Sequence, residues 1–349
     1  MGVYKSNKKS SKKGSIKILL SFAVLSILFF VLIFLVKNVR SIQNYRSIAA
    51  QKTASQRIVR PIAPRPDSRI PLKPISPIAA KPTFVPTIIP TPIPTIIPTQ
   101  GSKIINHTST NLNNIPISAI DQAKNRLHIA YGHSSHGSQL VTGMSGLVNF
   151  KGSTYAFRNG GGSGYLDLND NPFSGADDLG APNFTAWASV TRNYLNSHSN
   201  INVIIWSWCG EVSGSTASDI NTYLNLMSSL ERDFPNVTFV YMTGHTDGSG
   251  TNGNLNIRNE QIRQYCRDNN KFLYDFADIE SYNPDGLEFL SKGVNDACDY
   301  NSGNWATEWQ NSHTLNVDWY QCTSAHSQPL NANLKANAAW WLWAKLAGW

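Results

Sequence analysis

From residue 116 onward, short apolar runs alternate with longer segments whose apolar residues recur every three or four positions. The apolar runs predict strands at 126–132, 153–159, 202–208, 237–243 and 271–277. The periodic segments predict helices at 184–197, 217–234, 256–270 and 331–349. Strands that alternate with helices indicate one α/β domain over residues 116–349, with a mostly parallel sheet covered on both faces.

The start of the chain predicts a membrane anchor. Residues 18–36 are nineteen positions without a charge, and at 1.5 Å per residue they extend about 28 Å, close to the thickness of a bilayer core. Six lysines in residues 1–17 favour a cytoplasmic N-terminus. A cleaved signal peptide is the rival interpretation, but its apolar region is normally shorter. We therefore expect a basic cytoplasmic tail (1–17), a single-pass anchor (18–36) and an extracytoplasmic C-terminal part.

Residues 37–115 predict a proline-rich stalk. Twelve of the eighteen prolines lie between positions 61 and 98. Such a segment lacks regular backbone donors and favours extended polyproline II, which acts as a semi-rigid spacer. A linker with no role beyond its length is the alternative.

Charge separates the two parts of the chain. Residues 1–115 carry 17 Lys or Arg and one acid, whereas residues 116–349 carry 13 Lys or Arg and 21 acids. The basic pI of about 9.2 therefore belongs to the tail and stalk, and no nucleic-acid partner is expected for the acidic domain. The aromatic and aliphatic content of that domain excludes a wholly disordered chain.

Titratable and glycine-rich residues follow the predicted strands. Carboxyl ends of parallel strands form one edge of a sheet, where ligands bind in open sheets of this kind. The residues expected at that edge are His133, Ser134, Ser135, His136, Gly161, Cys209, Gly210, Glu211, His245 and Asp247, with His326 just before the last helix.

The order of these blocks resembles the SGNH (GDSL-like) hydrolase superfamily over roughly residues 124–349. The first block reads Gly-His-Ser-Ser-His-Gly, which matches Ser135 to the nucleophile of that superfamily and leaves Ser134 as the alternative. The Ala-His-Ser before the last helix matches His326 to its general base, and the glycines after 153–159 match Gly161 to an oxyanion-hole donor. The resemblance implies a flavodoxin-like three-layer sandwich and an ester hydrolase without a cofactor.

Two blocks depart from the superfamily pattern. Cys209-Gly210 stands where an Asn donor is usual, and Thr323 stands where an Asp usually precedes the histidine by three positions. Asp318 is the nearest upstream acid and is the expected third catalytic residue, with Asp247 or Glu211 as alternatives. A catalytic thiol at Cys209 is a further alternative to a small buried residue.

The combined expectation is a membrane-anchored extracytoplasmic serine esterase that acts on an ester or polysaccharide substrate, with carbohydrate O-acetyl groups as the favoured class. Such a mechanism needs a base beside the serine hydroxyl. One alternative is a non-catalytic carbohydrate-binding module, with aromatic side chains Trp305, Trp309 and Trp319 at its cleft. A zinc-dependent hydrolase is the other alternative, drawing on His133, His136, Cys209, His245, Asp247 and His326, although we expect no metal. In an extracytoplasmic domain a Cys298–Cys322 disulfide is plausible, and the sequence does not indicate an oligomeric state.

Overall fold

The computed structural model describes Gly2 and residues 103–349. Apart from Gly2, the expected tail and anchor and most of the stalk lie outside the described residues. Within the described part, no helix is both long enough and apolar enough to cross a bilayer.

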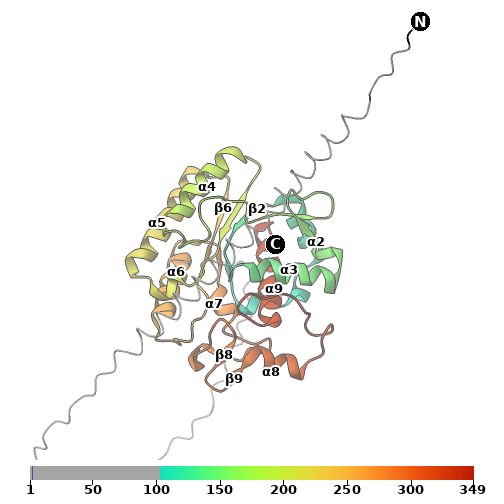
Figure 1. The fold of residues 1–349 in the computed structure, drawn as a ribbon, viewed down its shortest axis with the longest axis vertical. Coiled ribbons are helices and arrows are strands. Elements are labelled where there is room, and N and C mark those ends of the chain that lie inside the picture. The colour runs from blue at the N-terminus through green and yellow to red at the C-terminus, as the bar shows by residue number, and fades with distance from the viewer. Residues whose placement is uncertain (1, 3–102) are drawn as a thin grey trace, which may run out of the picture. The chain divides into compact units, whose positions relative to one another are not determined.

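A seven-stranded sheet forms the centre of the domain (Figure 1). The strand order is β1-β7-β6-β5-β2-β4-β3, and every neighbouring pair is parallel. The strands are β1 (Ile104–Ile105), β2 (His128–Gly132), β3 (Phe157–Arg158), β4 (Leu166–Asp170), β5 (Val203–Trp206), β6 (Thr238–Met242) and β7 (Leu273–Tyr274). A separate antiparallel pair is formed by β8 (Asp299–Tyr300) and β9 (Gly303–Asn304). The prediction of an α/β domain with a mostly parallel sheet is confirmed.

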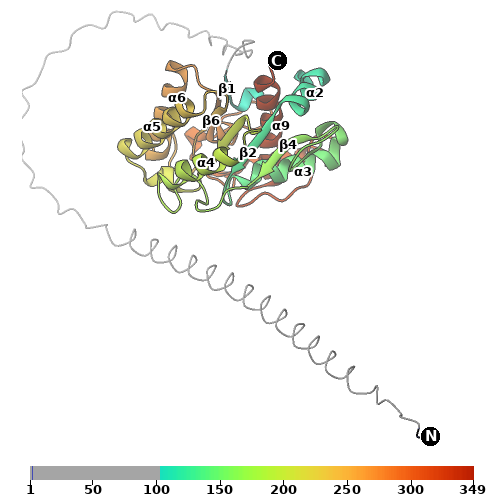
Figure 2. The ribbon, with the colours of Figure 1, turned by 90° about the horizontal axis from the view of Figure 1, so that it is seen from above.

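Helices cover both faces of this sheet (Figure 2). One face is covered by α2 (Ile117–Arg126), α3 (Ser138–Lys151) and α9 (Pro329–Leu346). The other face is covered by α4 (Ala186–Ser197), α5 (Ala217–Asp233) and α6 (Asn254–Asp268). The short α7 (Phe276–Ile279) follows β7. Residues 280–328 connect α7 to α9 and are called the insertion here; α8 (Trp305–Ser312) lies in it.

The central strands are buried on both sides. In β5, Val203 and Ile205 pack in the core with α3 and α9, whereas Ile204 and Trp206 pack in the core with α4 and α5. This two-sided burial explains why the strand is an unbroken apolar run rather than an alternating one.

The second strand lies later in the chain than predicted. Residues 153–159 contain only the two-residue edge strand β3, and the strand beside β2 is β4, which follows the glycines. The sequence of β4 contains acidic residues and therefore lacks the uninterrupted apolar run that predicts a buried strand. Asp167 is nevertheless buried, because its carboxylate pairs with His128 at 2.8 Å.

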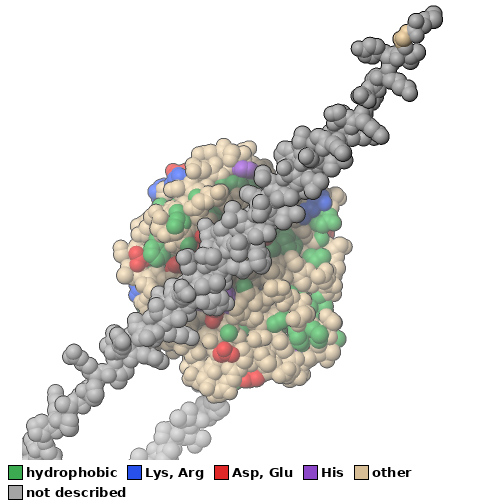
Figure 3. Space-filling model, in the orientation of Figure 1, with side chains coloured by type: hydrophobic (Ala, Val, Ile, Leu, Met, Phe, Trp, Pro, Cys, Tyr) green, Lys and Arg blue, Asp and Glu red, His purple; other side chains and the backbone are tan. Residues whose placement is uncertain are grey.

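The folded domain begins before residue 116. Ile105 is fully buried in β1, which pairs with β7, so the end of the expected stalk segment 37–115 belongs to the domain. Where the described atoms are visible in Figure 3, apolar side chains form separate patches among polar ones.

The chain reverses its direction of strand addition at β2. From β2 it continues to β3 and β4 on one side, and then returns to β5 on the other side of β2. In open parallel sheets, ligands bind at such a reversal, outside the carboxyl ends of the two central strands. Here those ends are Gly132 and Trp206, which pair with each other.

Candidate active site

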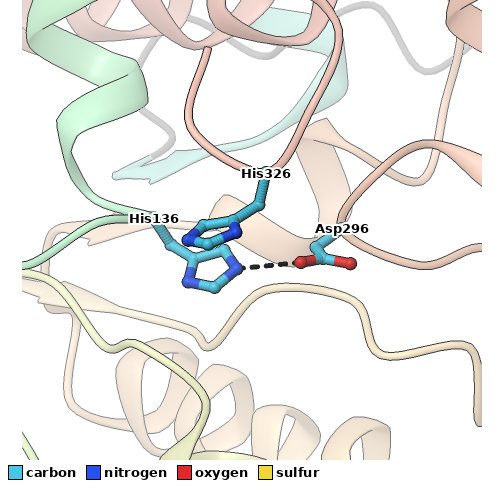
Figure 4. A group of neighbouring side chains, drawn as sticks. All are labelled: His136, Asp296 and His326. Atoms are coloured by element: carbon cyan, nitrogen blue, oxygen red, sulfur yellow. Dashed lines mark hydrogen bonds and ion pairs between the residues drawn. The ribbon is translucent and has the colours of Figure 1, made fainter. Parts of the chain in front are cut away.

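Three side chains at this edge form a hydrogen-bonded chain. His136, in the turn between β2 and α3, places Nδ1 at 3.1 Å from Sγ of Cys209, which follows β5. Its other ring nitrogen, Nε2, lies 3.0 Å from Oδ2 of Asp296, which lies in the insertion. Figure 4 shows the bond between His136 and Asp296 and the ring of His326 lying over that of His136.

Electrostatic interactions among Cys209, His136 and Asp296 favour a thiolate–imidazolium pair. Burial opposes charge on His136, but hydrogen bonds to Asp296 and Cys209 outweigh it and raise the pKa of His136 to about 9. Burial likewise opposes a charged Cys209, but hydrogen bonds from His136 and Ser135 bring the pKa of the thiol below its ordinary value. Burial opposes ionisation of Asp296 too, and the bond to His136 holds the pKa of that carboxyl low. The reactive thiolate form of Cys209 is therefore favoured.

His136 is sandwiched between two other imidazoles. The rings of His245 and His136 stack at 3.8 Å and 7°, and those of His326 and His136 stack at 4.5 Å and 21°. Burial and the nearby charge of His136 lower the pKa of both neighbours, so the outer rings stay neutral while the central ring is charged. His326 has φ of 61°, a left-handed conformation that is uncommon outside glycine and that clusters at functional sites.

The two serines of the first block have different surroundings. The hydroxyl of Ser134 donates to the carboxylate of Asp178 at 2.6 Å. Ser135 is exposed, and its Oγ lies 3.6 Å from Sγ of Cys209. Within residues 103–349, however, the Ser135 hydroxyl forms no hydrogen bond with His326. The ring of His326 stacks on that of His136 instead. The expected Ser135–His326 pair is thus not formed as a hydrogen bond.

Asp318 and Gly161 lie away from this chain of contacts. Asp318 accepts from the backbone N–H of Thr314 at 2.8 Å, and Asp296 is the acid whose charge acts on His326. Gly161 packs against Asp167 near the amino end of β4, because the glycines precede that strand instead of following it. The structure therefore corrects the expectation that Asp318 and Gly161 are parts of the site.

The remaining residues expected at this edge support the loops. Glu211 accepts the backbone N–H of Cys209 at 3.0 Å, and burial raises the pKa of its carboxyl. Gly210, between them, is exposed. His133 pairs with Asp170 at 2.7 Å. Asp247 accepts from the hydroxyls of Ser213 and Ser249.

Asp296 is the site residue that sequence reasoning missed. It lies in Gly-Val-Asn-Asp-Ala-Cys, within an insertion without strand or helix periodicity. Its one signal is an acid in a loop between the last strand and the last helix, which many loop residues share.

His136, Asp296 and His326 each offer a ligand atom, and these atoms lie within 4.8 Å of one another. The lone pairs of imidazole nitrogens lie in the ring plane, so two nearly parallel stacked rings do not direct them at a common point. Nε2 of His136 is also already bonded to Asp296. The group is therefore arranged as a hydrogen-bonded acid–base chain rather than as a metal centre.

Two expectations about the insertion are corrected. All four cysteines are free, so Cys298 and Cys322 form no disulfide. Trp305 is buried in the core, and Trp319 is partly buried against that core. Trp309 is mostly buried as well, but it borders a pocket that Phe150 and Tyr320 also line.

No protein-family model matches this sequence, and no curated protein is significantly similar to it.

Proposed function

We propose that the domain is an ester hydrolase in which Cys209 is the nucleophile, His136 the general acid–base and Asp296 the group that orients His136. The observation that carries this proposal is the pair of bonds to the two nitrogens of one imidazole, at 3.1 Å to the thiol and 3.0 Å to the carboxylate. A nucleophile beside a base that a third group orients is the arrangement that activates weak nucleophiles on many folds.

The proposed reaction has two acyl-transfer steps. The Cys209 thiolate bonds to the ester carbonyl carbon, the carbon–oxygen bond to the alcohol breaks, and the His136 imidazolium gives its Nδ1 proton to the leaving oxygen. In the second step a water molecule gives a proton to His136, its oxygen bonds to the acyl carbon, and the carbon–sulfur bond breaks. A carboxylic acid leaves and the thiolate–imidazolium pair is restored.

Backbone amides at the start of α3 are suited to hold the oxyanion. In the described part of the chain, the N–H groups of Ser135, His136 and Gly137 donate to no acceptor, and they precede the first turn of α3. Free N–H groups at a helix start favour negative charge, and fixed donors of this kind stabilise tetrahedral intermediates. The amide of Cys209 is excluded, because it donates to Glu211.

We also propose that the domain has the flavodoxin-like fold of SGNH-like hydrolases, and the strand order supports this. Across β4, β2, β5, β6 and β7 the order in space is that of flavodoxin-like sheets, in which the first strand lies between the second and third. His136 and Cys209 lie beside the carboxyl ends of β2 and β5, where that order reverses.

Ser135 is the second candidate nucleophile, with His326 as its base. Its hydroxyl is exposed and lies in the same cluster, 3.6 Å from the thiol of Cys209. His326 is exposed as well, and its ring would have to turn from the face of His136 to take the serine proton.

We further propose that the domain is anchored outside the cytoplasm by residues 18–36 and acts on carbohydrate O-acetyl esters. The nineteen uncharged residues and the proline-rich segment support this location. A tethered domain suits a substrate that is itself fixed in an envelope. Protease added to intact cells should cut the proline-rich segment and release the folded domain, including β1, if this orientation is right, and should leave the protein uncleaved if the domain is cytoplasmic.

Turnover of p-nitrophenyl acetate tests the chemistry. Cys209→Ala should lower kcat at least about 10³-fold, because the nucleophile is removed. Ser134→Ala should keep most activity, as should the control Cys322→Ala, whose thiol contacts Asn333 and Pro329 instead of the site. If Ser135→Ala abolishes turnover and Cys209→Ala does not, the serine mechanism replaces the thiol mechanism. If the wild-type protein cleaves no ester but is retained on polysaccharide, the binding-module interpretation replaces both.

A further inference from the structure

A fully buried ion pair lies beneath the site. Nζ of Lys335, in α9, lies 2.6 Å from Oε2 of Glu280, which follows α7, and neither side chain is exposed to solvent. Nζ also donates to Oε1 of Gln139 and lies over the ring of Phe276. Burying two charges costs several kcal/mol per ion before their attraction is counted, so stability alone is a weak reason for such a pair.

Hydrogen bonds connect this pair to the segments that carry three of the histidines. Gln139 is three positions after His136, and its Nε2 donates at 2.5 Å to the carbonyl oxygen of Ala325, next to His326. Glu280 accepts both the backbone N–H and the hydroxyl of Thr246, the residue after His245.

The same pair connects to the loop that carries Asp296. The amide of Asn331 donates to Oε2 of Glu280 at 3.3 Å and to the hydroxyl of Ser327 at 2.8 Å. That hydroxyl lies 3.2 Å from Sγ of Cys298, two positions after Asp296. Cys298 has φ of 70°, and a left-handed residue other than glycine, at a cost on the order of 1–3 kcal/mol, persists only where its surroundings hold it.

We propose that the buried Lys335–Glu280 pair is the positioning element of the active site. It joins four segments that are far apart in the sequence and fixes the residues they carry, which are His136, His245, Asp296 and His326. This inference rests on the proposed function only in calling the site catalytic. Lys335 and Glu280 hold the loops and do not contact the thiol, and the negative charge of Glu280 also contributes to raising the pKa of His136.

The pKa of the Cys209 thiol therefore depends on the loop positions that the distant Lys335–Glu280 pair maintains. If the loop that carries Asp296 moves, its 3.0 Å bond to His136 is lost, and with it a principal cause of the charge on His136. Without that charge, the pKa of the Cys209 thiol returns toward its ordinary value.

The test is the rate of Cys209 alkylation by iodoacetamide against pH, measured on the full-length chain by mass spectrometry of the Cys209 peptide. The variant Lys335→Met/Glu280→Gln removes both charges together, so that no unpaired buried charge remains. The matched control is Lys271→Met/Glu231→Gln, which removes a 2.6 Å ion pair beside the amino end of β7.

The wild-type protein and the control should show an alkylation midpoint below the ordinary thiol pKa. In Lys335→Met/Glu280→Gln the midpoint should rise, and kcat on p-nitrophenyl acetate should fall about 10²-fold with little change in KM, the effect of misplacing catalytic groups. A folded double variant with the wild-type midpoint overturns the positioning role.

Two variants that keep the charges of Lys335 and Glu280 separate positioning from the direct effect of the Glu280 charge, and they also decide if the double variant does not fold. Gln139→Met removes the bond to Ala325, and Thr246→Val removes the hydroxyl bond to Glu280. A raised midpoint in both supports the inference, and a wild-type midpoint in both overturns it. An ordinary midpoint in the wild-type protein contradicts the thiolate–imidazolium pair itself. A low midpoint without ester cleavage contradicts the hydrolase and leaves the positioning role standing.

Discussion

Sγ of Cys209 lies 3.1 Å from Nδ1 of His136, although 73 positions separate the two residues in the sequence. The contact is made because the strands before them, β5 and β2, are parallel neighbours with their carboxyl ends side by side. On the far side of the ring, His136 meets Asp296, which is 160 positions away. One imidazole thus joins the sheet edge to the insertion.

Asp296 should be needed for activity, and Asp318 should not. Asp296→Asn removes the carboxylate that holds the His136 ring and supports its charge, so kcat/KM should fall about 10²- to 10⁴-fold. Asp318→Asn is the matched control, because Asp318 accepts from Thr314 instead. Ester turnover at pH 7 measures both. Full activity of Asp296→Asn together with loss in Asp318→Asn would restore the acid expected from the sequence.

The pH profile of kcat/KM should be bell-shaped. Activity should rise as Cys209 loses its proton, below the ordinary pKa of a thiol, and fall near pH 9 as His136 loses the proton it must donate. The hydrogen bond from Asp296 raises the pKa of His136, so Asp296→Asn should move the falling limb below pH 9 in its residual activity. A falling limb at the same pH in both proteins contradicts this account of the charge.

Chelation should leave ester turnover unchanged. His136 is assigned to proton transfer and its two nitrogens are occupied by Cys209 and Asp296. Turnover should therefore be equal before and after dialysis against EDTA, and added zinc should inhibit by competing for the thiolate and imidazole. Loss of activity in EDTA that zinc restores would replace the acid–base mechanism with metal-dependent hydrolysis.

The sequence predicted the layers well, because most of the signal was periodic. The runs around Val203 and Thr238 are strands, and the helix expected at 217–234 is observed as Ala217–Asp233. β4 was missed because acidic residues, among them Asp167, interrupt the apolar pattern. Asp167 is accommodated in the strand because its carboxylate pairs with His128 and accepts from the side-chain amide of Asn169.

Part of the site could be predicted in the same way. His136, Cys209 and His245 follow strands, so the rule for carboxyl ends placed them together correctly. The role of Asp296 depends on how a non-periodic insertion folds back over the sheet edge. The pairing of Lys335 with Glu280 likewise depends on tertiary packing, since a lysine in a helix normally predicts an exposed position.

Gly143→Ala should destabilise the domain. A Cβ at Gly143, in α3, would lie 2.1 Å from the carbonyl oxygen of Ala332 in α9, so the two helices must separate. Such overpacking costs about 1–3 kcal/mol, and Tm should fall by roughly 3–10 °C in calorimetry. Gly214→Ala is the control, because a Cβ there meets no atom within 4 Å. An equal or higher Tm in Gly143→Ala would mean that α3 and α9 do not pack this closely.

The identity of the nucleophile is tested most directly by trapping the acyl-enzyme. The full-length protein is mixed with p-nitrophenyl acetate, quenched in acid and digested, and the acetylated peptide is identified by mass spectrometry. The account predicts an acetyl thioester on Cys209 that is absent from Cys209→Ala. An acetyl group on Ser135 or Ser134, still present in Cys209→Ala, would contradict it.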